Sequence, residues 1–166
     1  MIPFMPATGG HCAQCHSGPM LNEISGPEFQ LQTSLPRGAR FQNILTSEFN
    51  GGRLHDFNMN PMQTFVFDTP DGKVVVDSPD LGRAGITGDP SVSPAFDQLN
   101  AFKISSLWGV PLTAPYFHDN SARTLEDVAN HYQLFFETEF QNSGGFIDQR
   151  LTDQDKEDIV AFLRLL

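Results

Sequence analysis

The sequence predicts a mostly α-helical domain with long loops and one inserted β-hairpin. Two stretches near the C-terminus combine a helix-capping signal with apolar residues at helical spacing. Residues 64–77 alternate on either side of a turn, which is typical of a hairpin. Residues 21–63 are rich in Asn, Gly, Pro, Ser and Gln and lack a sustained period, which favours loops. Because the chain has 166 residues, we expect one domain, 1–166.

The most informative motif lies near the N-terminus and reads Cys12-Ala13-Gln14-Cys15-His16. Two cysteines separated by two residues and followed directly by histidine form the attachment signature of c-type haem. Each thiol can add to one vinyl group of the porphyrin, and His16 is then held under the iron as its proximal ligand. A carbonyl of the following loop, Ser17-Gly18-Pro19-Met20, is expected to accept the N–H of the other imidazole nitrogen.

A zinc site and a redox-active thiol pair are the two other sites in which such a motif occurs. A structural zinc site takes four ligands, usually from two separated pairs, and the chain has no second cysteine pair. His11, Cys12, Cys15 and His16 are too crowded to close a tetrahedron comfortably. A thioredoxin-type pair would stand beside a βαβ pattern, which does not follow here. A disulfide or redox pair therefore remains the alternative to one covalently bound heme c.

Composition and charge limit the partners and the location. The formal charge of −10 argues against nucleic acid and favours partners with positive patches. No stretch is long and apolar enough to cross a membrane. Residues 1–10 do not read as a signal peptide or as a helix leading into the motif. Because c-type haem is attached outside the bacterial inner membrane, we expect an exported, periplasmic or extracellular protein whose signal sequence is not in this chain. The chain is then expected to be a mature product, a fragment, or one half of a two-haem protein.

The middle of the chain is predicted to be loop apart from two elements. A short helix is expected at 41–49, and the hairpin at about 64–77 turns at Thr69-Pro70-Asp71-Gly72. Residues 78–101 return to loop. Further side chains able to bind iron are His55, Met59 and Met62, and Arg53 and Arg83 are either partners of haem propionates or solvated charges.

The C-terminal part predicts two amphipathic helices. The first has Thr124 as its N-cap and Asp127 three residues later. Its apolar face carries Leu125, Val128, Ala129, Tyr132 and Phe136. The second begins at Thr152, with Asp155 in the matching position. Its buried face carries Ile159, Phe162, Leu163 and Leu166. Neither helix is expected to be stable alone, so both should pack on each other and on the haem.

Four stretches, in family order, resemble the C-terminal haem domain of the bacterial di-haem cytochrome c peroxidase and MauG family. They read CAQCHSGP, DLGRAGITGD at 80–89, FKISSLWGVPLTAPYFHDNSARTLEDVANHY at 102–132, and LTDQDKEDIVAFLRLL at the end. The resemblance implies a cytochrome c-like haem domain, a periplasmic setting and electron transfer linked to peroxide chemistry.

The resemblance also implies roles for individual residues. His16 matches the proximal iron ligand, and Tyr132 matches the distal ligand, which is methionine in typical peroxidases and tyrosine in MauG-like proteins. A core tyrosine bonded to a propionate or to the backbone is the other reading of Tyr132. His131 is an alternative distal ligand, although it projects about 100° around the helix from Tyr132. His118 matches a histidine close to the haem, which either gates electron or proton flow or hydrogen-bonds the loop.

Three departures from the family bear on function. Thr113 and Pro115 match backbone ligands of a calcium ion, but the other ligands of that ion come from a domain that this chain lacks. The family often reads Leu-Arg-Asn-Val where this chain has Leu107-Trp108-Gly109-Val110, which loses a cation near the haem and gains an indole. With a single Cys-x-x-Cys-His motif, the chain holds only the half that relays electrons in the family.

Three functions follow as hypotheses. The first is a c-type haem electron-transfer protein or subunit that serves a redox protein partner, a second haem domain or another subunit. The second is an oxidoreductase, a cytochrome c peroxidase-like or MauG-like oxidant acting on hydrogen peroxide, with His118 as its acid–base candidate. The third is a non-catalytic haem subunit whose loops and hairpin dock a larger assembly.

Overall fold

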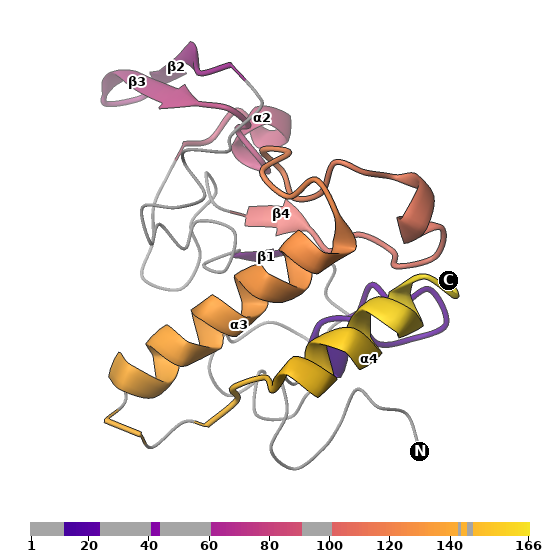
Figure 1. The fold of residues 1–166 in the computed structure, drawn as a ribbon. Helices are drawn as coiled ribbons and strands as arrows, with labels where there is room; N and C mark the ends of the chain where they lie inside the picture. The colour runs from indigo at the N-terminus through magenta and orange to yellow at the C-terminus, as the bar shows by residue number, and fades with distance from the viewer. Residues whose placement is uncertain (1–11, 24–40, 44–60, 91–100, 143, 146–147) are drawn as a thin grey trace.

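The computed structural model of the chain describes residues 12–23, 41–43, 61–90, 101–142, 144–145 and 148–166. This part of the chain contains three α-helices, two short 3₁₀ turns and two small antiparallel sheets, whose arrangement is drawn in Figure 1. Helices and strands share the described residues, so this part is a mixed α and β structure and is less helical than the sequence predicts. In the described residues no helix is both long and apolar enough to span a membrane.

The predicted hairpin is confirmed and is one residue longer at each end. Strand β2 (Gln63–Thr69) pairs antiparallel with β3 (Gly72–Ser78). Gly72, at φ 124°, closes the turn in a backbone conformation that side chains rarely adopt. Phe67 is buried, whereas Val66 and Val75 pair across the outer face and are exposed. The hairpin lies beside the short helix α2 (Ala84–Thr87), at the opposite end of the molecule from α4 (Figure 1).

The second sheet was not predicted. Strand β1 (Phe41–Asn43) pairs antiparallel with β4 (Ala101–Lys103), with Gln42 opposite Phe102. The helix expected at 41–49 is therefore wrong over 41–43, and residues 44–49 lie outside the described part. Helix α2 occupies positions where only loop was expected, and β4 begins at residue 101, the last residue of that predicted loop. A three-residue strand is stabilised by its distant partner, which local periodicity does not reveal.

Both predicted C-terminal helices are confirmed, together with their caps. Helix α3 (Leu125–Asn142) follows Thr124, whose hydroxyl accepts from Asp127 N at 3.1 Å while Thr124 N donates to the Asp127 carboxylate at 3.0 Å. Helix α4 (Asp153–Leu163) follows Thr152 with the same reciprocal pair to Asp155, at 3.1 and 2.8 Å. Such a reciprocal pair of hydrogen bonds is called a capping box. It gives partners to backbone N–H groups at the start of a helix that have none within the helix.

The core lies where α3 and α4 pack together. Leu125 and Ala129 on α3 meet Val160 and Leu163 on α4, and all four side chains are buried. Partly buried apolar residues surround them, namely Leu107, Val110, Tyr116, Ile159, Phe162 and Leu166. The Arg164 side chain also donates to Glu126, and Lys156 donates to Asn130 at 3.2 Å. The helix pair therefore includes the 107–116 segment in its core, as well as the predicted apolar faces.

Replacing Thr152 with Ala should lower the free energy of unfolding by about 1 kcal/mol, because Asp155 N loses its acceptor. The hydrogen bonds from Thr152 hold the pKa of Asp155 below its ordinary 3.8. The contribution of these bonds to the free energy of unfolding is complete above pH 3.8. It is lost as the pH falls through the lower pKa that Asp155 has in the folded chain. In urea unfolding, Thr152→Ala should therefore differ most from wild type at neutral pH, and the difference should narrow in acid to the part that comes from the Asp155 N–H bond. Glu157→Ala, at an exposed position of α4, is the control, and an equal loss there would contradict the role of the cap.

Candidate haem site

The motif forms a single tight turn. The 3₁₀ turn η1 (Cys12–Gln14) continues so that Cys12 O accepts from Cys15 N at 3.2 Å and from His16 N at 2.9 Å. Both thiols are half-buried, and the two cysteines are not joined in a disulfide. The turn therefore presents Cys12, Cys15 and His16 from one compact piece of backbone.

The imidazole of His16 is oriented by the loop that follows it. Its Nδ1 lies 2.9 Å from Leu21 O. A carbonyl oxygen can only accept, so Nδ1 carries the proton and the lone pair of Nε2 is left to bind a metal. The sequence predicts a carbonyl of residues 17–20, and the structure uses the next residue. Burial lowers the pKa of His16, and the bond to Leu21 opposes this effect, so the ring is neutral at neutral pH.

The loop reaches Leu21 through two residues with left-handed backbone. Gly18 has φ 73° and Leu21 has φ 52°, and Leu21 N donates to Gly18 O at 3.1 Å. Ser17 then pairs with Glu23, which closes the loop on itself. A Cβ at Gly18 would lie 2.8 Å from a carboxylate oxygen of Glu23, so the glycine permits the close approach. This local geometry holds the Leu21 carbonyl oxygen 2.9 Å from Nδ1 of His16.

The thiols do not have the character of a redox pair. Burial raises the pKa of Cys12 and of Cys15 to about 11, so both are protonated thiols at neutral pH. A thioredoxin-type nucleophile depends on a lowered thiol pKa. The structure also shows no group of three or more His, Cys, Asp or Glu side chains placed to hold a metal ion among the described residues. The raised thiol pKa values therefore do not favour a dithiol catalyst, and the donor set of two thiols and one neutral imidazole fits a c-type haem.

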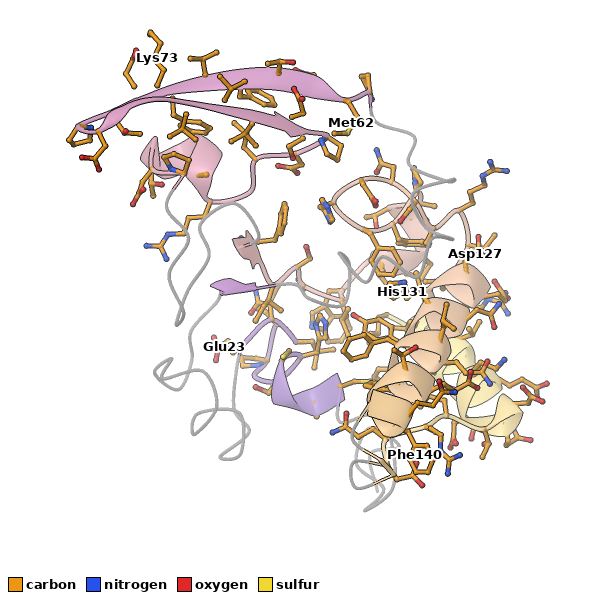
Figure 2. All side chains as sticks on the ribbon, turned by 90° about the vertical axis from the view of Figure 1, so that its left-hand side faces the viewer. Glu23, Met62, Lys73, Asp127, His131 and Phe140 are labelled. Atoms are coloured by element: carbon orange, nitrogen blue, oxygen red, sulfur yellow. The ribbon has the colours of Figure 1, made fainter. Side chains whose placement is uncertain are left out.

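Helix α3 brings two further predicted residues to an aromatic region. His131 is only 4% exposed, and its ring centroid lies 4.7 Å from that of Phe117. Tyr132 is partly buried, 6.3 Å from Phe117 and 5.5 Å from His131 between centroids. Phe136 lies 6.0 Å from Tyr132. In Figure 2, His131 lies on the side of α3 turned toward the Cys12–Glu23 segment.

The sequence placed Tyr132 on the buried face and His131 outside it, and this ranking of burial is wrong. Helix α3 is buried on two sides, against α4 through Ala129 and against the loop that carries Phe117 through His131. Apolar periodicity finds the first side only, because the second side is built from a histidine and a distant loop. Both candidate distal ligands thus contact the same aromatic ring.

His118 occupies a separate, half-buried position. Its ring lies 4.3 Å from that of Phe102, the middle residue of β4. Burial lowers the pKa of His118, while the charges of Asp119 and Asp80 act to raise it. Asp119 is itself buried and accepts from Ser121 N, and Asp80 accepts from Gly82 N. Asp80, from the 80–89 stretch, thus lies close enough to His118 for its charge to affect the pKa of the imidazole, as does Asp119 from the PYFHD stretch.

The predicted calcium ligands lie on the surface. Thr113 and Pro115 follow the second 3₁₀ turn, η3 (Val110–Leu112), and both are exposed. The Thr113 hydroxyl and amide both donate to Val110 O, at 3.0 and 3.1 Å. A calcium site here stays a prediction.

Of the remaining candidates for contact with the iron or with the propionates, the structure describes Met62 and Arg83. Met62 is 57% exposed and lies at the open end of the hairpin (Figure 2). His55, Met59 and Arg53 lie outside the described residues. Arg83 is partly exposed at the N-cap position of α2.

Two residues near the site were not predicted to have a role in it. The indole Nε1–H of Trp108 donates to Pro19 O at 2.9 Å, and the Ser106 hydroxyl donates to Met20 O at 2.7 Å. In the sequence, only the difference from the family at Trp108 pointed to the Trp108–Pro19 hydrogen bond. Nothing in the sequence pointed to the Ser106–Met20 hydrogen bond.

Comparison with known proteins does not assign the chain. No family model matches it, and searches of curated proteins and of solved structures find no significant match.

Replacing His118 with Gln should flatten the pH dependence of stability below pH 6.5. Because burial lowers the pKa of His118, the unfolded chain binds its proton more readily than the folded one. The contribution of neutral His118 to the free energy of unfolding is complete above pH 6.5, the ordinary pKa of histidine, and is lost as the pH falls below that value. His16, whose pKa is also lowered, should leave a residual slope that His16→Gln removes. Urea titrations at each pH measure both, and an unchanged slope in His118→Gln would contradict the assignment.

Proposed function

We propose that the chain is an exported, periplasmic c-type haem protein that transfers electrons, with a cytochrome c-like arrangement. One observation carries this proposal. Directly after Cys-x-x-Cys, the Nδ1–H of His16 is bonded to Leu21 O, which leaves Nε2 as a metal donor. A bond of this kind fixes the tautomer and raises the basicity of an iron ligand, and a redox thiol pair has no need of it.

Each part of the site has a task in this proposal. Cys12 and Cys15 would hold the group through two thioether bonds, and His16 would bind its iron from the proximal side. Helix α3 would supply the distal side through Tyr132, with His131 as the alternative. The haem supplies one-electron redox chemistry when bound, and the protein tunes it through the axial ligands and burial.

The surroundings suit a carrier that changes charge by one electron. The rings of Phe102, Phe117 and Phe136 line the region next to His118, His131 and Tyr132. Aromatic side chains exclude water and lower the local dielectric, so small changes in axial ligation have large effects on redox potential.

Charge indicates the kind of partner. The chain carries a formal net charge of −10, which attracts a redox partner or second haem domain with a positive surface. Such attraction mainly raises the association rate and fades with salt, as suits a transient electron-transfer encounter.

A peroxidase-like or MauG-like oxidant acting on hydrogen peroxide is the second candidate. It is favoured by the half-buried His118, whose pKa responds to Asp119 and Asp80. A histidine poised in this way can accept a proton from a substrate and return it. This function also requires an iron that peroxide can reach, which electron transfer does not.

Replacing Cys12 and Cys15 together with Ala should abolish covalent haem in protein produced with a haem-attachment system. Both thioether bonds are lost, so acid–acetone should extract all haem, and the intact mass should equal that of the polypeptide. Each single variant is the matched control, because one thioether should survive and resist extraction. Haem that stays bound to the double variant after extraction would refute the attachment site.

Replacing Tyr132 with Phe in the haem-loaded protein should convert the ferric EPR and optical spectra from low-spin or tyrosinate-type to high-spin. The reason is that phenylalanine offers no oxygen to the iron. His131→Gln is the matched variant on the same helix and should leave the spectrum unchanged. The reverse result would make His131 the ligand, and no change in either variant would exclude α3 as its source. A high-spin spectrum in wild type, with peroxide turnover, would favour the oxidant.

A further inference from the structure

We infer that Trp108 and Ser106 are positioning residues for His16, acting through the loop whose carbonyl orients its imidazole. The expected effect on redox potential rests on the proposed function. The effect on the orientation and tautomer of His16 depends only on contacts within the polypeptide.

Three successive carbonyls of the loop each accept one hydrogen bond from a side chain. Pro19 O accepts from the indole Nε1–H of Trp108 at 2.9 Å, and Met20 O accepts from the Ser106 hydroxyl at 2.7 Å. Leu21 O then lies 2.9 Å from Nδ1 of His16. The first two bonds come from a segment more than 80 residues away, and the third comes from the ring to be oriented. Fixing the first two carbonyls therefore limits how far the third can move.

The distant segment is itself well anchored. Ser106 Oγ also accepts from Trp108 N at 3.2 Å, which ties the two donors together. Leu107, between them, packs against the α3–α4 core, and Gly109 N donates to Leu166 O at 3.0 Å. A continuous path of contacts thus runs from the helix pair through Trp108 and the loop to His16.

The loop needs this support because its own backbone is locally unfavourable. Leu21 has φ 52°, a left-handed backbone conformation that is unfavourable for a residue with a side chain. Trp108 is 52% exposed, so burial of its ring explains only part of its presence here. Its indole N–H supplies the loop with one directed donor that carries no charge.

The chemical consequence follows from the imidazole. While Leu21 O holds the Nδ1 proton, the ring is a stronger donor at Nε2 and stabilises the oxidised iron. If the loop slackens in the haem-free chain, the bond weakens and the Nε2–H tautomer becomes populated. In haem-loaded protein Nε2 would be bound to iron, so a weaker Nδ1–H bond would instead make the imidazole a poorer donor and raise the reduction potential.

The test compares Trp108→Phe, Ser106→Ala and the double variant with wild type. Phenylalanine keeps an aromatic ring but removes the N–H, and Ser105→Ala at the exposed neighbouring position is the matched control. The tautomer of His16 is measured by ¹⁵N NMR of the imidazole in the haem-free chain. The midpoint potential is measured by redox titration of the haem-loaded protein.

We expect His16 to be the Nδ1–H tautomer in wild type and in Ser105→Ala. In each positioning variant the ratio of tautomers should shift toward Nε2–H by about fivefold, the effect of losing one net hydrogen bond, and further in the double variant. In haem-loaded protein the same variants should shift the potential to more positive values.

The two proposals fail in different ways. A wild-type chain that takes up no covalent haem would refute the proposed function, while the tautomer measurement would still decide the role of Trp108 and Ser106. Tautomer ratios equal to those of Ser105→Ala in all three variants would overturn the positioning role, whether or not haem is attached. If Trp108→Phe fails to fold, Ser106→Ala alone decides the matter.

Discussion

The packing of α3 against α4 is the contact on which the rest of the described structure depends. Leu125 and Ala129 meet Val160 and Leu163, and burying each of the larger apolar side chains contributes roughly 1.5–3 kcal/mol. The same contact includes Leu107 and so fixes the segment that reaches the His16 loop. The position of the candidate proximal ligand is thus set by a core made of residues near the C-terminus.

Helix α3 is also buried on a second side, against the loop that carries Phe117. His131 is buried against Phe117, where an imidazole contributes less to stability than an apolar side chain of similar size. Proteins generally accept such a cost at sites where the polar group has a chemical task. In the proposed function, one side of α3 stabilises the fold, and the other side, with His131 and Tyr132, supplies the chemistry.

The sequence predicts those features that depend on neighbouring residues. The two Thr–Asp caps and the 64–77 hairpin are local, so periodicity and turn chemistry were sufficient to find them. The pairing of β1 with β4 and the contacts of Trp108 join distant segments and leave no local pattern. The burial of His131 was missed for the same reason, because it depends on where a separate loop lies. The Cys-x-x-Cys-His motif predicts a c-type haem, but only the fold shows which carbonyl orients the imidazole.

The hairpin has a practical consequence for handling the protein. Its outer face carries the exposed pair Val66 and Val75, and the Asp68–Lys73 ion pair lies next to its turn. The turn at residues 70 and 71 is exposed and distant from α4 (Figure 1). Exposed turn tips of this kind accept insertions well. A fluorophore or surface tether attached there would report on encounters with a partner or an electrode while the His16 loop stays intact.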